Sequence, residues 1–463
     1  MGRQSGWRKP RETDQATTQH HCQHQPSPKK QLSGGGGCAG FRAALDSVDP
    51  GFSGPRIQWA QDSVGPDCVE PENPATADML PPLPSLRMSS PVLVVGAGFA
   101  GAVVARELAE AGRSVRVIDR RPHIGGNAFD ALNDHGERLH VYGPHLLHGE
   151  ADSVAIRWLS RFTEWVPYEH RVRAVLADGR TTPLPVNRTT LEDVFGVELA
   201  TEAAAKELLA SEVVAGTPSN TDEFFLANVG PRLADIFFRP YTRKMWGVPP
   251  TELEAAVGAR LPVRWNRDDR YFTDSFQAMP KDGFTAMFER ILDHPLISVS
   301  LGQAYGPDLD ADVSHTFLSL PIDEYFGFRI GRLPYRSIRF ETSSVSADQP
   351  ATVINYTDTG IYTRCTQWDL IPNSGRRQDG QHTVTREIPC DAADNNNECY
   401  YPVRNRETLA RYEQYEALAA TEPNKTFIGR CGLFRYLDMV PCVNIHLRLA
   451  ATFLGQVQAQ AVA

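Results

Sequence analysis

The sequence predicts an α/β protein in which a Rossmann-like domain is discontinuous along the chain and is combined with a helical domain and an antiparallel β-sheet domain. Three observations predict this class. An apolar run at 92–95 stops at a glycine turn, continues as a helical pattern, and leads to a second apolar run at 115–118. A helix-rich stretch then reaches Trp246, and short β-like runs alternate with turns from about 297 to 405. Near the end, 425–430 is typical of a buried strand that closes with glycine before a final helix.

The first predicted strand runs into the glycine-rich motif Gly96-Ala97-Gly98-Phe99-Ala100-Gly101. We expect Gly96 to make the tight turn, Gly98 to let a pyrophosphate approach the backbone, and Gly101 to let the helix pack close to the strand. Free N–H groups at the helix start would then face phosphates, and Asp119, at the end of the second strand, would bind ribose hydroxyls. The alternative is a glycine turn without a ligand, and the position of Asp119 argues against it. The motif therefore predicts a dinucleotide site.

The residues after Asp119 indicate which dinucleotide is bound. Arg120 is followed by a second glycine pair, Gly125-Gly126, and then by Asn127. An acidic residue followed shortly by two glycines resembles the FAD-binding signature of the glutathione-reductase-like flavoproteins, whereas NAD dehydrogenases usually lack that second pair. The sequence therefore favours FAD.

The composition excludes some classes of function. Of 463 residues, 41% are hydrophobic and 22% are charged, as in ordinary globular proteins of two or three domains. The formal net charge of −9 argues against non-specific nucleic-acid binding, which needs a basic face. No apolar run is long enough to cross a membrane. The 8 cysteines lack zinc-type spacing, so we expect no metal, reduced thiols and a cytoplasmic location.

Residues 1–88 differ in composition from the rest of the chain. They are rich in Gln, Ser, Gly, Pro and His, and they lack both hydrophobic periodicity and the apolar segment of a secretory signal. We expect this leader to be disordered, and we interpret Met88 as the natural start; an intact mass beginning at Met1, in protein from the native source, would contradict this. The cluster at 20–24 has metal-ligand side chains, but in a disordered tail we expect no metal site.

Local patterns place the later elements. Helical spacing appears at 153–162, and strand-like alternation appears at 171–177. Thr189 and Glu192 resemble a capping box that opens the helix-rich stretch, in which 200–214 is strongly helical. We expect a leader at 1–88, an FAD-binding domain in three parts at 89–165, 281–300 and 426–463, a β-sheet domain in two parts at 166–186 and 301–425, and a helical substrate domain at 187–280.

Two histidines and two mixed segments are candidates for chemistry. His145 and His148 follow a Gly-Pro turn, so we expect both on a loop. Such a pair is more often structural, but the flavin unit upstream favours a position beside the isoalloxazine ring. The segments 238–247 and 260–272 combine aromatic residues with arginines, which can stack on a base and match phosphate oxygens. Core aromatics with a solvated arginine face are the alternative that these residues leave open.

Eight further motifs follow one another along the chain. They are Tyr142-Gly143-Pro144-His145, Pro183-x-Pro185-x-Asn187, Tyr241-Thr242-x-Lys244-x-Trp246-Gly247, Arg260-Leu261-Pro262-Val263-Arg264, Asp268-Asp269-x-Tyr271-Phe272, Tyr362-Thr363-Arg364, Tyr400-Tyr401-Pro402 and Arg435-Tyr436-x-Asp438-Met439. In these motifs the chain resembles the bacterial UDP-galactopyranose mutases, over nearly its whole length beyond the leader.

The resemblance implies an FAD enzyme that interconverts UDP-galactopyranose and UDP-galactofuranose with no net redox change. It implies that N5 of the reduced flavin attacks the anomeric carbon and displaces UDP, which later returns. It also implies a homodimer that supplies galactofuranose for cell-wall or surface glycans. Two alternatives stay open: a flavin oxidoreductase of the amine-oxidase-like superfamily, and an inactive relative that binds nucleotide sugars.

The resemblance also implies roles for individual residues. The predicted catalytic residues are Arg260 and Arg364, which would clamp the diphosphate, and His148, which would tune the flavin or relay protons at it. The predicted substrate-binding residues are Tyr241, stacking on uracil, Trp246, near the sugar, and Arg260, Tyr271, Arg364, Tyr401 and Tyr436. The predicted cofactor-binding residues are Gly96, Gly98, Phe99, Ala100, Gly101, Asp119, Arg120, Gly126, Asn127, His145, Arg430, Tyr436, Asp438 and Met439.

Four positions depart from the family pattern. Leu320 stands where Gly is usual, Gln367 where Glu is usual, and Cys431 where Leu is usual. Pro441 would disturb the expected final helix. We expect these changes near flavin or substrate, where they would affect activity and flavin affinity.

Overall fold

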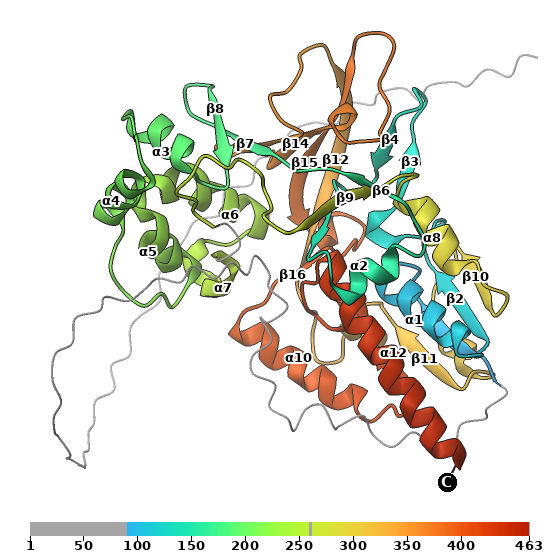
Figure 1. Cartoon of the computed structure of the whole chain (residues 1–463). Helices are drawn as coiled ribbons and strands as arrows, with labels where there is room; N and C mark the ends of the chain where they lie inside the picture. The colour runs from blue at the N-terminus through green and yellow to red at the C-terminus, as the bar shows by residue number, and fades with distance from the viewer. Residues whose placement is uncertain (1–89, 259–261, 463) are drawn as a thin grey trace, which may run out of the picture. The chain divides into compact units, whose positions relative to one another are not determined.

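A five-stranded parallel sheet forms the first part of the fold. The computed structural model describes residues 90–258 and 262–462; the leader at 1–88, with Met88 and the cluster at 20–24, lies outside these ranges. The strands of this sheet come from both ends of the described chain, so the predicted α/β class with a discontinuous Rossmann-like domain is confirmed. In sheet order the strands are β10 (Ile297–Leu301), β2 (Val115–Asp119), β1 (Val92–Val95), β11 (His315–Leu318) and β17 (Lys425–Phe427) (Figure 1).

Helices cover both faces of this sheet. Successive side chains of a strand point to opposite faces, so β1 sends Val92 and Val94 into one core and Leu93 and Val95 into another. The first core lies under α1 (Phe99–Glu110), α2 (Val154–Leu159), α8 (Phe284–Leu292) and α12 (Met439–Val462). The second core lies under α9 (Ile322–Tyr325) and α10 (Arg406–Ala419), which contributes the fully buried Tyr415. The short helix α11 (Gly429–Gly432) follows β17.

A seven-stranded sheet forms the second part. Its order is β16 (Tyr401–Pro402), β12 (Tyr335–Val345), β15 (His382–Asp391), β14 (Arg364–Gln367), β13 (Val353–Tyr356), β7 (Val172–Val175) and β8 (Thr181–Leu184). All neighbouring strands run antiparallel as predicted, except that β13 and β7 run parallel. Strand β11 belongs to the parallel sheet, although the predicted boundary placed 301–425 in the β-sheet domain. Its sequence, His-Thr-Phe-Leu, carries no mark that separates the two sheets.

Two smaller sheets complete the strands. One pairs β3 (Asp130–Leu132) with β4 (Arg138–His140), and the other has the order β5 (Leu147–Gly149), β9 (Phe276–Pro280) and β6 (Trp165–Pro167). Four of the 3-10 segments lie in the connections: η1 (Gly126–Ala128), η4 (Pro307–Asp310), η5 (Trp368–Leu370) and η6 (Ala392–Asp394).

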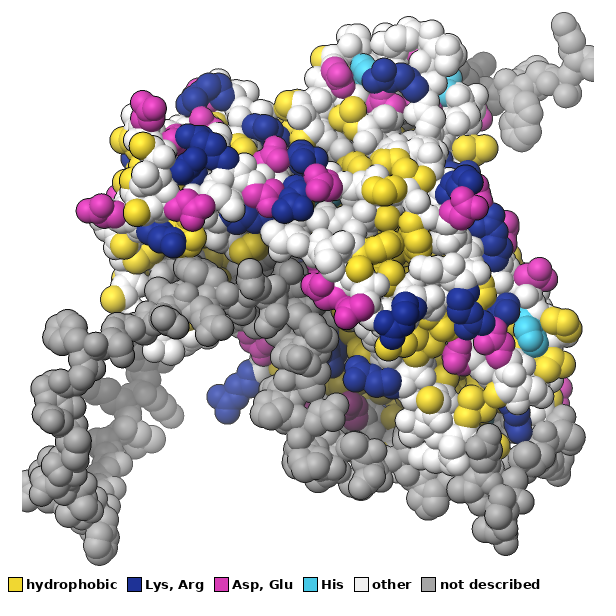
Figure 2. Space-filling view, in the orientation of Figure 1, with side chains coloured by type: hydrophobic (Ala, Val, Ile, Leu, Met, Phe, Trp, Pro, Cys, Tyr) yellow, Lys and Arg dark blue, Asp and Glu magenta, His cyan; other side chains and the backbone are white. Residues whose placement is uncertain are grey.

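The helical part packs on the β7–β8 end of the seven-stranded sheet. Its elements are α3 (Arg188–Phe195), α4 (Glu202–Glu212), α5 (Thr221–Leu233), the π-helix η2 (Ala234–Phe238), α6 (Arg239–Trp246), η3 (Pro250–Glu252) and α7 (Ala255–Gly258). The predicted capping box is wrong by two residues: Asn187 is the N-cap of α3, and Thr190 completes the box. Figure 2 shows basic and acidic side chains interspersed over this part on the face in view.

The last helix corrects the expectation about Pro441. Helix α12 begins at Met439, so Pro441 lies in its first turn and the helix continues to Val462. The first turn has N–H groups without an intrahelical partner, so a proline there removes no helical hydrogen bond. Among the residues that the structure describes, no helix combines the length and the apolar character needed to cross a membrane.

Candidate active site

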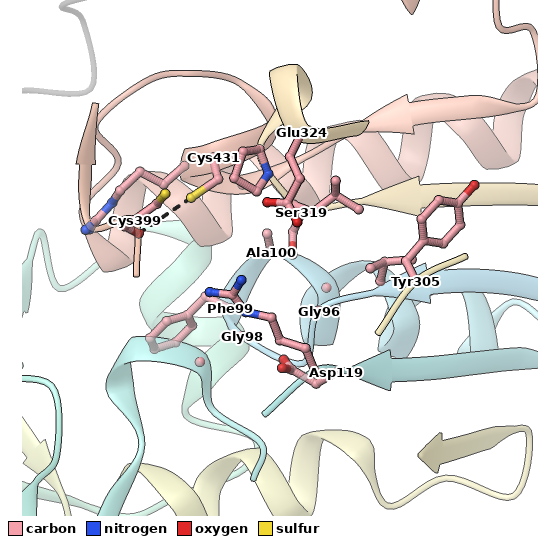
Figure 3. Close-up of a pocket in the computed structure, with 18 of the residues that line it drawn as sticks. Gly96, Gly98, Phe99, Ala100, Asp119, Tyr305, Ser319, Glu324, Cys399 and Cys431 are labelled. Carbon is pink, nitrogen blue, oxygen red and sulfur yellow. Dashed lines mark hydrogen bonds between the residues drawn. The ribbon is translucent and has the colours of Figure 1, made fainter. Parts of the chain in front are cut away.

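The larger of two neighbouring cavities lies where β1 and β2 end and α1 begins. Gly98 is the N-cap of the twelve-residue α1 and supplies no side-chain cap, so the first N–H groups of the helix are available to a ligand. The cavity encloses about 870 Å³, which suits a large ligand. Figure 3 shows the glycine turn, Phe99 and Asp119 around this space, with Cys399 and Cys431 on the facing side.

The glycines of the motif bring backbone against backbone. Gly96 has a φ of +106°, in the region that favours glycine. A Cβ on Gly101 would lie 1.9 Å from the carbonyl oxygen of Gly96, so α1 can pack against the turn only with glycine there. A Cβ on Gly98 would lie 3.4 Å from Cα of Gly126, the residue that opens η1 across the cavity. The wall around the helix start is therefore made largely of backbone.

Asp119 holds the glycine turn closed. Its Oδ2 accepts a hydrogen bond from the backbone N of Ala97 at 2.8 Å, and its Oδ1 accepts one from the backbone N of Arg121 at 2.9 Å. A carboxylate has about four acceptor sites, so acceptor capacity remains for hydroxyl groups of a ligand.

The structure brings almost all predicted cofactor-binding residues to this cavity. Tyr436 is the exception, since it lines only the second cavity. The residues that line the larger cavity are Gly96, Gly98, Phe99, Ala100, Gly101, Asp119, Arg120, Gly126, Asn127, His145, Arg430, Asp438 and Met439.

The second cavity collects the predicted substrate residues. It encloses about 340 Å³ between α6, β13, β14 and the end of β5. The predicted Arg260 lies outside the residues that the structure describes. The predicted residues that line it are Tyr241, Trp246, Tyr271, Arg364, Tyr401, Tyr436 and His148.

The two cavities meet at a common wall. Four residues line both of them: His145, Arg430, Asp438 and Met439. A ligand in the larger cavity and a ligand in the smaller one can therefore contact the same four residues.

His148 is a charged imidazole held between two carboxylates. It lies in strand β5 rather than on the predicted loop, because β9 pairs with this segment. Its Nδ1 is 3.1 Å from Oδ2 of Asp274, its Nε2 is 3.4 Å from Oδ2 of Asp438, and its ring stacks on Phe272 at 3.6 Å between centroids. Burial alone would lower the pKa of His148, but the two carboxylates outweigh burial and raise the pKa to about 9.

Asp438 shares this electrostatic arrangement. Burial would raise the pKa of Asp438, but the hydrogen bond and charge of His148 lower it to about 2. The backbone N of Met439 also donates to Oδ1 of Asp438 at 2.7 Å. The common wall therefore holds a carboxylate that stays ionised at neutral pH.

His145 is neutral, in contrast to His148. It lies on the predicted loop, and its Nδ1 is 2.8 Å from the carbonyl oxygen of Gly143, so Nδ1 carries the proton. Burial lowers the pKa of His145 to about 4. At neutral pH its Nε2 is therefore a hydrogen-bond acceptor.

Arg364 is oriented by a buried carboxylate. Its Nε lies 2.8 Å from Oε2 of Glu387, whose side chain is 1% exposed. Burial would lower the pKa of Arg364, but the charge of Glu387 raises it well above the usual value. Because Glu387 binds Nε, the outer guanidinium nitrogens can face the cavity.

Arg430 is held by two backbone carbonyls. Its Nη1 donates to Tyr400 and its Nη2 donates to Leu437, both at 2.8 Å. The guanidinium carbon lies 4.7 Å from the ring centroid of Tyr436. These contacts fix a positive charge at the common wall.

Sequence reasoning missed three residues of this site: Asp274, Glu387 and Asn355. Asn355 lines the smaller cavity and is the cross-strand partner of Arg364, which places both side chains on one face. It is 7% exposed, and among the described residues its Oδ1 has no hydrogen-bond partner. Strand register brings these residues to the site, and no local motif marks them.

The departures from the family pattern do not all lie at the cavities. Leu320 and Cys431 line the larger cavity, as expected. Gln367 lines neither cavity, so that expectation is wrong: it is fully buried and donates to Asp348 at 2.7 Å and to Asp369 at 2.8 Å.

The fold and the paired cavities define a Rossmann-like dinucleotide-binding protein with a second, charged ligand pocket. Comparisons with known proteins agree. Residues 94–162 match the family model of the NAD(P)-binding Rossmann-like domain, and residues 236–436 match that of UDP-galactopyranose mutase.

Two relatives cover most of the chain. It is 38% identical over 375 residues to a probable UDP-galactopyranose mutase of Klebsiella pneumoniae, and the similarity covers 80% of this chain and 96% of the relative. It is 35% identical over 382 residues to dTDP-fucopyranose mutase of Escherichia coli, which covers 78% and 98%. The fold is similar to the crystal structure of reduced UDP-galactopyranose mutase, with a TM-score of 0.62, 17% identity, and coverage of 80% and 96%.

The chain belongs to the UDP-galactopyranose mutase family, and it is an enzyme of the isomerase class. The predicted family is thus confirmed.

Proposed function

We propose that this enzyme interconverts UDP-galactopyranose and UDP-galactofuranose, with FAD in the larger cavity and the nucleotide sugar in the smaller one. The observation that carries the proposal is the common wall of His145, Arg430, Asp438 and Met439, which brings the two cavities next to each other. Membership of the family supports the choice of reaction.

The larger cavity fits FAD. The uncapped start of α1 suits a pyrophosphate, and Asp119 retains acceptor sites for ribose hydroxyls. A backbone wall at Gly98 and Gly126 allows close approach of phosphates. When bound and reduced, the flavin would supply a nucleophilic nitrogen, N5, for the anomeric carbon, with no net redox change.

Side chains of the smaller cavity would bind the substrate. Arg364, oriented by Glu387, would hold the diphosphate and stabilise the charge that develops as UDP leaves. Arg260 is proposed as the second arginine of this clamp. Tyr241 would stack on the uracil, Trp246 would lie near the sugar, and Tyr271, Tyr401 and Tyr436 would donate hydrogen bonds.

The two histidines would have opposite roles: His145 belongs to the common wall, and His148 lines the smaller cavity beside Asp438 of that wall. His148 carries a proton at neutral pH and can donate it, whereas His145 is neutral and can only accept at Nε2. This pairing provides both a donor and an acceptor for proton transfers during ring opening and closing.

The test uses the full chain. Purified protein with a flavin spectrum is reduced anaerobically with dithionite, incubated with UDP-galactofuranose, and analysed by chromatography. We expect UDP-galactopyranose only with reduced protein, and at least about a hundredfold lower kcat/KM in Arg364→Ala. Reduction of the flavin by the sugar nucleotide itself would instead favour the oxidoreductase alternative, and UDP binding without conversion would favour the inactive relative.

A second substrate is tested in parallel. One relative is a dTDP-fucopyranose mutase, so the assay also compares a substrate with a different base and sugar. A higher kcat/KM for dTDP-fucopyranose than for UDP-galactopyranose would replace the proposed substrate while leaving the reaction type unchanged.

The cytoplasmic location, the homodimer and the destination of galactofuranose in surface glycans stay predictions. Light scattering on the purified chain tests the dimer, and cell fractionation tests the location.

A further inference from the structure

Two cysteines lie together on the wall of the larger cavity. Cys431 lies in α11, and its Sγ is 3.7 Å from the carbonyl oxygen of Cys399, which precedes β16. Both residues line the cavity, and Figure 3 shows the two sulfur atoms in the same part of it. Cys442 also lines this cavity, but its Sγ lies 3.6 Å from Nδ1 of His446, whereas Cys365 and Cys390 line neither cavity. The neighbouring thiols are thus a feature of the dinucleotide cavity.

The pair depends on a residue that departs from the family pattern. Cys431 stands where the family motif usually has Leu, directly after Arg430. Cys399 is half-buried and its Sγ donates to the carbonyl oxygen of Asn397 at 3.4 Å. Neither thiol has a role in the proposed reaction.

We propose that Cys399 and Cys431 form a thiol–disulfide modification site whose oxidation is coupled to occupancy of the dinucleotide cavity. The inference rests on the proposed binding of FAD there. The oxidant is a small-molecule disulfide: the thiolate of one cysteine attacks it and releases one thiol, and the second cysteine then attacks the mixed disulfide. Two S–H bonds are lost, one S–S bond forms in the protein, and the reagent leaves as two thiols, so atoms and electrons balance.

Occupancy and oxidation oppose each other for a geometric reason. A dinucleotide in the cavity would cover the wall to which both cysteines belong, and would so restrict access of the reagent to them. Joining the sulfurs would also tie the segment before β16 to α11, where Sγ of Cys431 lies 3.7 Å from the carbonyl oxygen of Cys399, and would so alter the wall that a dinucleotide contacts. Restricted access slows the exchange, whereas the altered wall changes an equilibrium. Coupling between two equilibria is reciprocal, so the altered wall of the oxidised protein should weaken FAD binding.

The chemistry sets the pH dependence of the exchange. Burial raises the pKa of the Cys431 thiol to about 11, and burial raises the pKa of the Cys399 thiol still further. The thiolate is the attacking species, so exchange is slow at neutral pH and accelerates as the pH rises.

The experiment uses flavin-free and FAD-loaded full-length protein treated with glutathione disulfide at alkaline pH. Free thiols are then alkylated, and the disulfide-linked peptides are identified by mass spectrometry. We expect the peptide that joins Cys399 to Cys431 in flavin-free protein and at least about tenfold less of it in the FAD-loaded form. Oxidised protein should bind FAD about tenfold more weakly than reduced protein, measured by quenching of flavin fluorescence.

Variants separate the pair from other thiols. Cys431→Leu, which restores the usual family residue, and Cys399→Ala should each lose the linked peptide and make FAD affinity insensitive to glutathione disulfide. Cys390→Ser, in β15, should behave as the unmodified chain does. Mixed disulfides without the linked peptide, or equal linkage with and without FAD, would overturn the proposal.

Failure of the proposed function gives a different result. If the protein with free thiols bound no FAD, both the proposed function and the proposed coupling would be wrong. The peptide that joins Cys399 to Cys431 would still test the disulfide itself, because it is measured in flavin-free protein. If FAD bound and catalysis occurred but no linkage formed, only the thiol proposal would be wrong.

Discussion

At the scale of single residues, the charge on His148 comes from the two carboxylates that face its ring. We expect Asp274→Asn to lower the pKa of His148 from about 9 toward the ordinary 6.5, because one of two stabilising charges is removed. Asp274 does not line either cavity, so the change acts through His148. Titration of the imidazole resonances by NMR measures the pKa directly.

The same shift predicts how stability depends on pH. A pKa higher in the folded than in the unfolded state stabilises the fold fully below about pH 6.5, and this contribution is lost as the pH rises through about 9. Between those values, the free energy of unfolding should fall less steeply in Asp274→Asn than in the unmodified chain. Asp312→Asn, at an exposed ion pair, is the control and should leave the slope unchanged. Equal slopes for all three proteins in denaturant titrations would contradict the assignment.

Glu387 is the residue whose loss should affect stability and activity together. We expect Glu387→Gln to lower the free energy of unfolding by about 2–3 kcal/mol, because Arg364 would keep its charge without the buried partner. The proposed diphosphate clamp would also lose its orientation, so kcat/KM should fall. Glu341→Gln, at an exposed position in β12, should change stability by less than about 0.5 kcal/mol. A Glu387→Gln enzyme with unchanged stability and kcat/KM would show that the pair does not orient the arginine.

At the scale of elements, the start of α3 separates the two possible capping residues. We expect Asn187→Ala to destabilise the protein by about 1 kcal/mol, because the Asn187 side chain accepts from the backbone N of Thr190. Thr189→Ala should cost less than about 0.5 kcal/mol, since Thr189 lies inside the helix and makes an exposed contact with Arg267. Chemical denaturation compares the two variants, and the reverse order would restore the capping box predicted from sequence.

The position of proline in α12 gives a second test. Pro441→Ala should change the free energy of unfolding by less than about 0.5 kcal/mol, because the first turn of a helix needs no donor there. Ala450→Pro, at a fully buried position in the middle of the same helix, should cost about 3 kcal/mol or more. A large effect of Pro441→Ala would mean that the proline itself shapes the helix start.

These elements also show what could be predicted from sequence. The 92–119 unit was predictable because apolar period, glycine spacing and the final acidic residue agree within one continuous segment. The cap of α3 was misplaced because Thr189–Glu192 and Asn187–Thr190 fit the same local pattern, and only packing distinguishes them. His148 was expected on a loop because it follows a Gly-Pro turn, and its pairing partner, β9, is more than a hundred residues away in the chain, so no local pattern marks the strand.

At the scale of the whole molecule, the pairing of strands that are distant in the sequence limits prediction of the site. Arg364 and Asn355 are neighbours through the register of β14 and β13, and Glu387 reaches Arg364 from β15. Asp274 lies just before β9, and the pairing of β9 with β5 brings it to His148. Residues that belong to family motifs could be anticipated through the resemblance, whereas their supporting partners depend on the tertiary pairing of distant strands.

The common wall predicts that a ligand bound in the smaller cavity changes the surroundings of the flavin in the larger one. UDP at about a hundred times its Kd should stabilise the FAD-loaded protein by about 2.7 kcal/mol, by mass action on the folded state. It should also change the visible spectrum of the flavin, because a ligand in the smaller cavity contacts the four residues that line both cavities. Arg364→Ala should lose both effects, since the proposed phosphate contact is gone, while FAD remains bound because Arg364 does not line the larger cavity. Thermal unfolding and difference spectroscopy measure the two effects on one sample. Stabilisation without a spectral change would place UDP away from the common wall, and the assignment of the smaller cavity to the nucleotide sugar would then be wrong.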